Sequence, residues 1–391
     1  MGQLCGKKDY SPDGVSERKP RKNYEVVRFF MAGRGSAGKS TIIRHLKYLC
    51  TKNSSYKYCN EDWTEANPND SDDDLWKRTI RASIIKALDV FIKEAANEKL
   101  ELATESLKEF AATIENLAED EGEIENLDLT EDFTTHLLEL LEDPAIVGAR
   151  NLKNKLSGNI ALFDGLNYFL EPEKLKEVFA PEYVASEPDR VHGRLPTTGV
   201  HRYYFMLNRI RIEIYDSGGQ ASEVQKIFNH LTKWNTGAVS KRNFILFVAS
   251  LADYNVPHPS LEKETMLNDA AAFMHLLLNN DHTRHCGLLI FFNKKDRFLE
   301  KMADPACRDD IKYIQGLSED EVKKYVEKGR FREHVMINAA SKPFVDYLRS
   351  EHSDINSYSR DTCAIDPNIM NTFYEVIRKE ILNETISSVL P

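Results

Sequence analysis

A glycine-rich stretch near the start of the chain has the composition and spacing of a phosphate-binding loop. Residues Gly33 to Ser40 read G-R-G-S-A-G-K-S and fit the pattern G-x-x-x-x-G-K-[S/T] in full. In such a loop the backbone N–H groups surround phosphate oxygens, Lys39 reaches the β- and γ-phosphates, and the Ser40 hydroxyl binds Mg²⁺. The residues expected to line a nucleoside phosphate are Gly33, Arg34, Gly35, Ser36, Ala37, Gly38, Lys39, Ser40 and Thr41.

A second group of polar residues, D-S-G-G-Q at 216–220, follows an alternating apolar segment. The carboxylate of Asp216 is suited to the shell of a Mg²⁺ ion, because this cation prefers oxygen ligands. The N–H group of Gly219 is suited to a γ-phosphate, and the side chain of Gln220 to orienting an attacking water. Downstream of a phosphate loop, these residues predict a metal-assisted hydrolytic site.

A third motif, N-K-K-D, comprises Asn293, Lys294, Lys295 and Asp296 and follows a short apolar run. A carboxylate at Asp296 can accept hydrogen bonds from both N1–H and the exocyclic amine of guanine, whereas adenine offers no such pair of donors. The motif therefore favours a guanine nucleotide over an adenine nucleotide, with Asn293, Lys294 and Asp296 at the base.

The segments around these motifs predict alternating strands and helices. A β-rich run at 24–32 leads into the phosphate loop, and a helical pattern at 39–50 follows it. Further strands are expected at 200–207, 209–215, 244–249 and 288–292. The last two are continuous apolar runs, which are typical of strands buried on both faces of a parallel sheet. Together they predict an α/β, doubly wound, mostly parallel sheet.

The stretch between the first two motifs has a different character. Residues 58–187 are acidic and rich in helical apolar spacing, for example from Leu75 to Phe91, which predicts an inserted all-helical domain. The predicted organisation is therefore a flexible arm at 1–23, an α/β domain at 24–57 and 188–391, and the helical insertion at 58–187.

Composition excludes several classes of protein. The 391 residues are 41% hydrophobic and carry a net charge of −10, so the chain can build a core and lacks the basic excess of a nucleic-acid coat protein. No apolar run approaches the length of a membrane span, and no secretory signal is visible. The six cysteines show no metal-binding spacing and are expected to be reduced thiols.

The three motifs, in this order, resemble those of the GTPase superfamily, and the long helical insertion narrows the match. Over residues 24–391 the chain resembles the α subunit of heterotrimeric G proteins. The resemblance implies a Ras-like P-loop GTPase domain with an inserted helical domain. It also implies a switch that binds GTP·Mg²⁺, hydrolyses it to GDP and phosphate, and relays a receptor signal to effectors. A slowly cycling nucleotide-dependent interaction module with little GTPase turnover is the alternative.

Further site residues are implied by the resemblance alone. The segment R-L-P-T-T-G from Arg194 matches the first switch, which makes Arg194 the arginine supplied in cis and Thr197 the second protein ligand of Mg²⁺. Asp164 matches an aspartate that faces Lys294 across the nucleotide. The family's guanine-packing loop is matched by Thr362, Cys363 and Ala364, and the alternative segment Asn338–Lys342 fits less well because of its distance from the C-terminus.

Three departures from the family pattern concern regulation and partners. Ser36 stands where a glutamate usually pairs with the cis arginine, so Arg194 is expected to be freer, and Ala221 stands where the second switch usually has arginine. The segment before the phosphate loop is short and contains prolines, which leaves open whether a βγ dimer binds. The resemblance implies a receptor at the last helix (Phe373–Leu390), an effector at the switches and an RGS-type activator.

The N-terminal residues suggest lipid attachment. Gly2 and Cys5 are placed for myristoylation and palmitoylation, although Gly6 stands where the myristoylation motif has Ser or Thr. We therefore expect a lipid-anchored protein on the cytoplasmic face of the plasma membrane, with a soluble cytoplasmic fraction as the alternative.

Overall fold

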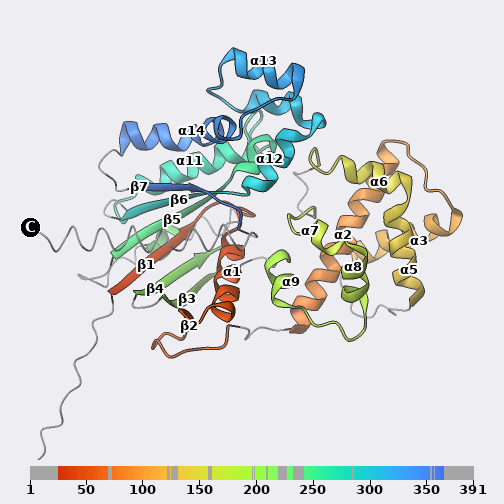
Figure 1. Cartoon of the computed structure of the whole chain (residues 1–391), viewed down its shortest axis with the longest axis horizontal. Helices are drawn as coiled ribbons and strands as arrows, with labels where there is room; N and C mark the ends of the chain where they lie inside the picture. Colours follow the sequence, from red (N-terminus) through yellow and green to blue (C-terminus); the bar gives the residue numbers. More distant parts are fainter. Residues whose placement is uncertain are drawn as a thin grey trace, which may run out of the picture.

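The computed structural model describes the conformation of most of the chain between residues 25 and 364 (Figure 1). The described residues are 25–68, 73–120, 124, 131–156, 161–195, 197, 199–207, 210–218, 227–231, 242–283, 286–352, 355 and 357–364.

A seven-stranded sheet forms the centre of one part of the molecule, and its strand order is β2-β3-β4-β1-β5-β6-β7. The pairs β2·β3 and β3·β4 are antiparallel, and the other four pairs are parallel. The strands are β1 (Glu25–Ala32), β2 (Tyr56–Cys59), β3 (Val200–Leu207), β4 (Ile210–Ser217), β5 (Arg242–Ser250), β6 (Gly287–Asn293) and β7 (Ser357–Asp361). The predicted mixed α/β class is confirmed.

Helices cover both faces of this sheet (Figure 1). One face packs against α11, α12 and α14 through a core that includes Phe247, Phe273 and Phe344. The other face packs against α1 through Ile42, Leu46 and Leu49. The elements concerned are α1 (Lys39–Lys52), η1 (Leu251–Asn255), α11 (Met266–Leu278), α12 (Lys295–Ala303), η2 (Pro305–Tyr313), α13 (Glu319–Lys328) and α14 (Glu333–Glu351).

A second group of helices lies beside the sheet (Figure 1) and has its own core. Its buried residues run from Trp76 to Ala185, so we call residues 73–195 the helical unit. Its helices are α2 (Asp73–Asn97), α3 (Glu105–Glu119), α5 (Glu131–Glu142), α6 (Pro144–Asn151), α7 (Leu166–Phe169), α8 (Pro172–Phe179) and α9 (Glu187–His192). No described helix combines the length and the apolar composition that crossing a bilayer requires.

The short strand β2 differs from the sequence-based expectation. Its residues Tyr56–Cys59 pair with Tyr204–Leu207 of β3, so the sheet extends two residues past the predicted boundary between 57 and 58. Acidic residues follow it closely, and a four-residue edge strand needs little apolar patterning. The composition of the following segment therefore obscured this strand.

Candidate functional site

The phosphate loop connects β1, in the interior of the sheet, to the N-terminus of α1. Gly33 has φ +145°, and a Cβ atom there would lie 2.2 Å from the carbonyl oxygen of Val248 in β5. Gly38 has φ +100°, and its Cβ would lie 2.2 Å from the side-chain nitrogen of Asn293. Only glycine fits at these two positions, because the backbone is left-handed and lies against neighbouring atoms. The loop is therefore held close to β5 and to the N-K-K-D motif.

Lys39 lies at the first position of α1, and its side chain folds back onto the loop. Its Nζ donates to the carbonyl oxygens of Gly33 at 2.8 Å and Arg34 at 3.2 Å. Burial lowers the pKa of Lys39 to about 8, against the opposing effect of the Asp216 carboxylate. An anionic ligand beside the ammonium group would favour its charged form and raise this pKa.

The three predicted metal ligands lie together next to Lys39. The hydroxyls of Ser40 and Thr197 are in contact, and Ser40 Oγ donates to Asp216 Oδ2 at 3.1 Å. Burial raises the pKa of Asp216, although Lys39 opposes this. The other carboxylate oxygen, Oδ1, is buried without a hydrogen-bond partner among the described residues.

This arrangement fits a magnesium ion. Two hydroxyls and one carboxylate are hard oxygen ligands, and Mg²⁺ is commonly held by few protein groups together with substrate phosphates and water. Among the described residues no group of three or more His, Cys, Asp or Glu side chains forms an alternative metal site. The buried Asp216 Oδ1 is the atom that a cation would satisfy.

Asn293 joins the three loops of the expected base site. Its Nδ2 donates to the carbonyl oxygen of Ala37 at 2.8 Å. Its Oδ1 accepts hydrogen bonds from Thr362 Oγ1 at 3.2 Å and from the N–H of Ala364 at 3.1 Å. The segment Thr362–Ala364, which includes the buried Cys363, therefore lies beside the N-K-K-D motif, whereas Asn338–Lys342 lies within α14.

Lys294 and Asp164 connect the sheet to the helical unit. Lys294 Nζ lies 2.7 Å from Asp164 Oδ2, which is the contact expected between them. Burial disfavours the charge on Lys294, but the carboxylates of Asp164 and Asp253 outweigh it and raise its pKa. Burial likewise disfavours the charge on Asp164, yet Lys294 and Arg297 leave its pKa lowered. Both members of the pair are therefore charged at neutral pH.

Asp296 lies exposed in the first turn of α12. No hydrogen bond or ion pair from the described residues reaches its carboxylate. The two oxygens of this carboxylate accept no hydrogen bond from the described residues, so they suit the paired N–H donors of guanine.

Arg194 reaches the phosphate loop from the segment after α9. Its Nη2 donates to Ser36 Oγ at 2.9 Å. Burial lowers the pKa of the guanidinium, with Asp164 opposing. Ser36 thus contacts Arg194 through a hydroxyl at the position where the family usually has a glutamate carboxylate. The expectation that Arg194 is freer than with a glutamate partner stays a prediction.

The described members of the predicted site lie around the ends of β1, β4, β6 and β7. Gly219, Gln220, Gly2 and Cys5, and the segment Phe373–Leu390, for which a receptor contact was expected, lie outside the described residues. Sequence reasoning missed Arg44 of α1, whose partners include two backbone carbonyls of the helical unit. Its position gave no signal, because a contact with backbone carbonyls does not appear as a sequence motif.

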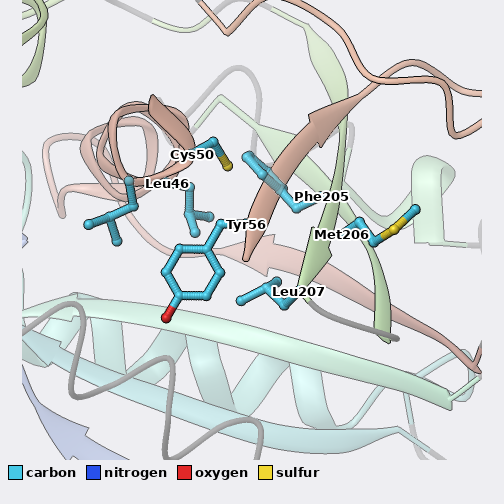
Figure 2. Close-up of a pocket in the computed structure, with 7 residues that line it drawn as sticks. Leu46, Cys50, Tyr56, Phe205, Met206 and Leu207 are labelled. Atoms are coloured by element: carbon cyan, nitrogen blue, oxygen red, sulfur yellow. The ribbon is translucent and has the colours of Figure 1, made fainter. Parts of the chain in front are cut away.

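A small apolar cavity lies elsewhere, between α1 and the strands β2 and β3 (Figure 2). It is lined by Leu46, Leu49, Cys50, Tyr56, Phe205, Met206 and Leu207. No charged side chain lines it, so it is not a candidate for a nucleotide phosphate.

Comparisons with known proteins show which proteins this chain is similar to. The chain is 24% identical to the guanine nucleotide-binding protein alpha-4 subunit of Dictyostelium discoideum over 374 residues, or 96% of this chain and 94% of that protein. It is 28% identical to the alpha-6 subunit of Caenorhabditis elegans over 43% of this chain and 44% of that protein. It is 25% identical to the G(s) subunit alpha of Schistosoma mansoni over 73% of this chain and 67% of that protein.

A sequence model of the family described as G-protein alpha subunit matches residues 7–381. The low identities indicate a divergent member. This chain belongs to the G-protein alpha subunit family and is a guanine-nucleotide-binding signalling protein.

Proposed function

We propose that the protein is a GTPase switch, which binds GTP with Mg²⁺, hydrolyses it to GDP and phosphate, and relays a receptor signal to effectors. The observation that carries the proposal is the convergence of Ser40, Thr197 and Asp216 beside Lys39 and Arg194. A cation and an anionic phosphate would each find complementary charge there. Asp296, with an unoccupied carboxylate, supports guanine as the base.

The roles of the residues follow from their positions and from the family. Bound Mg²⁺ would neutralise charge on the phosphates. The ammonium of Lys39 would move from the carbonyls of Gly33 and Arg34 to phosphate oxygens. Arg194 would stabilise charge on the transferring phosphoryl group, and Gln220 would orient the attacking water. These catalytic roles are carried over from the family's phosphoryl-transfer mechanism rather than derived from geometry.

Two measurements test this function. Competition of GDP and of ADP against a fluorescent GTP analogue should show displacement by GDP alone. Single-turnover phosphate release should then show a Mg²⁺-dependent burst. Selective binding of GDP without a burst of phosphate would favour the alternative, a slowly cycling interaction module. The presence of Ser36 where the family usually has glutamate supports this alternative.

The partners and location form part of the same proposal. We place a receptor at Phe373–Leu390, an effector at the switches and an RGS-type activator at the hydrolytic site, and leave the βγ dimer open. We propose attachment to the cytoplasmic face of the plasma membrane through lipids on Gly2 and Cys5. The family membership supports the kind of partner, and the first residues of the sequence support the attachment.

A further inference from the structure

The position of Arg194 depends on the segment that carries it into the site. Arg194 follows α9, and its tip contacts Ser36 Oγ at 2.9 Å. An arginine side chain has many rotamers, so a contact at its tip does not by itself hold the guanidinium in one place. The backbone immediately before Arg194 must be held as well.

Arg44 holds this backbone from the other part of the molecule. Its Nη1 donates to the carbonyl oxygens of Arg190 at 2.9 Å and Gly193 at 2.7 Å. These carbonyls lie at the C-terminal end of α9 and directly before Arg194. The last carbonyls of a helix lack partners within the helix and favour a cation, so a guanidinium suits them.

Arg44 is itself fixed on α1. Its Nε donates to the Ser40 carbonyl at 3.1 Å, and its Nη2 donates to Thr41 Oγ1 at 3.3 Å. The guanidinium lies over the ring of Trp76, 5.3 Å from the centroid. Burial lowers its pKa to about 10, with Asp216 opposing, so it is charged at neutral pH. One helix thus presents Lys39 and Ser40 to the phosphates and Arg44 to the segment of Arg194.

Gly165 of the helical unit also packs closely against this segment. A Cβ atom at Gly165 would lie 2.1 Å from the carbonyl oxygen of His192. Within α9, the fully buried Asp189 accepts hydrogen bonds from Tyr168 Oη at 2.8 Å and Tyr183 Oη at 2.9 Å. Contacts within the helical unit and contacts from Arg44 therefore both hold α9.

We propose that Arg44 is a positioning residue for hydrolysis: it holds the backbone of residues 190–193 so that Arg194 reaches the phosphate loop. The inference rests on the proposed GTPase function. It assigns to Arg44 an effect on the reaction through Arg194, without contact between Arg44 and the nucleotide.

The test compares two substitutions of Arg44 with a matched control. Arg44→Met keeps most of the side-chain length and removes the donors, whereas Arg44→Lys keeps the charge. The control is Arg81→Met, because Arg81 likewise donates to two carbonyls, those of Val178 at 2.9 Å and Ala180 at 2.6 Å. Thermal unfolding identifies any variant that fails to fold.

Single-turnover hydrolysis of bound GTP supplies the first result. We expect Arg44→Met to be at least tenfold slower than wild type, Arg44→Lys to recover part of the rate, and Arg81→Met to match wild type. The double variant Arg44→Met/Arg194→Cys should be no slower than Arg194→Cys alone, because both changes remove the same contribution, that of Arg194 to hydrolysis. A wild-type rate in folded Arg44→Met, or fully multiplicative effects in the double variant, would overturn the inference.

Hydrogen–deuterium exchange of the GDP-loaded full chain supplies a result that does not depend on turnover. Arg44→Met should increase exchange in residues 188–195, and Arg81→Met should not. If wild type binds GDP and does not hydrolyse GTP, the proposed function fails while the exchange result still decides whether Arg44 holds this segment. Equal protection of 188–195 in wild type and Arg44→Met would refute it.

Discussion

At the scale of single residues, we expect Asp296 to decide which base binds. Its exposed carboxylate has no partner among the described residues, and Asn293 beside it is committed to three contacts. We expect Asp296→Asn to raise the dissociation constant of GDP at least tenfold, since losing hydrogen bonds to a charged group costs about 1.5–3 kcal/mol. Titration with a fluorescent GDP analogue measures this.

Asp309→Asn is the control for that change, because Asp309 is also an exposed aspartate and lies on η2 rather than at the base. It should bind GDP as wild type does. Unchanged GDP affinity in Asp296→Asn would remove Asp296 from the base site.

Arg194 and Gln220 should act on the same step of hydrolysis. Removing one preorganised donor to developing charge costs about 10²–10³ in rate in other enzymes. We expect Arg194→Cys and Gln220→Leu each to slow single-turnover hydrolysis at least tenfold with GTP binding nearly intact, and their effects to be less than additive. Phosphate release reports hydrolysis, and a fluorescent GTP analogue reports binding.

Normal hydrolysis in Arg194→Cys would exclude Arg194 as the cis arginine. Arg190→Lys is unsuitable as a control, since Arg190 pairs with Asp73 and Glu187 in the same segment. Arg150→Cys serves better, because it changes an arginine of α6 in the helical unit.

The single residues of the site were predictable where they belong to a short sequence motif. Lys39, Ser40, Asp216 and Asn293 could be predicted because their chemistry is tied to short spacings in the sequence. Arg44 could not be, because its two carbonyl partners lie 146 and 149 residues away. The hydroxyl of Ser36 was read as a missing glutamate, although it can accept a hydrogen bond from Arg194.

At the scale of elements, α12 connects the base site to the helical unit. Beyond the Lys294–Asp164 pair, Lys153 Nζ lies 2.8 Å from Glu300 Oε1. The buried Asn154 donates to Asp304 at 2.9 Å and accepts from Arg297 at 3.2 Å. If a nucleotide binds between Asp164 and the sheet, as proposed, its release would require these contacts to loosen, so we expect them to slow it.

We expect Lys153→Ala combined with Asn154→Ala to speed GDP dissociation about three- to tenfold. The partly exposed ion pair contributes little, whereas loss of the buried amide removes two hydrogen bonds, at about 0.5 kcal/mol each. The off-rate of a fluorescent GDP analogue measures this. Lys155→Ala, which changes an exposed neighbouring lysine, should leave the rate unchanged, and equal off-rates in all three proteins would contradict the prediction.

The elements themselves were predictable to different degrees. The strands β1, β5 and β6 are apolar on both faces, so their sequences indicated them directly. The edge strands β2 and β7 escaped prediction, since most of their side chains are partly or fully exposed and they read as polar connections. Edge strands depend on pairing with a neighbour rather than on their own composition.

At the scale of the whole molecule, charge opposes membrane binding. The chain carries a net charge of −10, which an anionic membrane surface repels. The segment from Lys7 to Lys22 is locally basic, so it could offset this electrostatic repulsion only near the N-terminus. A lipid on Gly2 alone gives marginal, reversible binding. Stable attachment therefore requires two signals.

We expect Gly2→Ala or Cys5→Ser to shift the protein from the membrane to the soluble fraction, because one signal by itself cannot overcome the repulsion. Fractionation of cells that express the full chain measures this, with Gln3→Ala as a control that leaves both modification sites in place. Metabolic labelling with myristate and palmitate analogues shows whether each lipid is attached. If the Gly2→Ala/Cys5→Ser double variant sediments with membranes as wild type does, attachment by these lipids is excluded and the basic segment or a partner must hold the protein there.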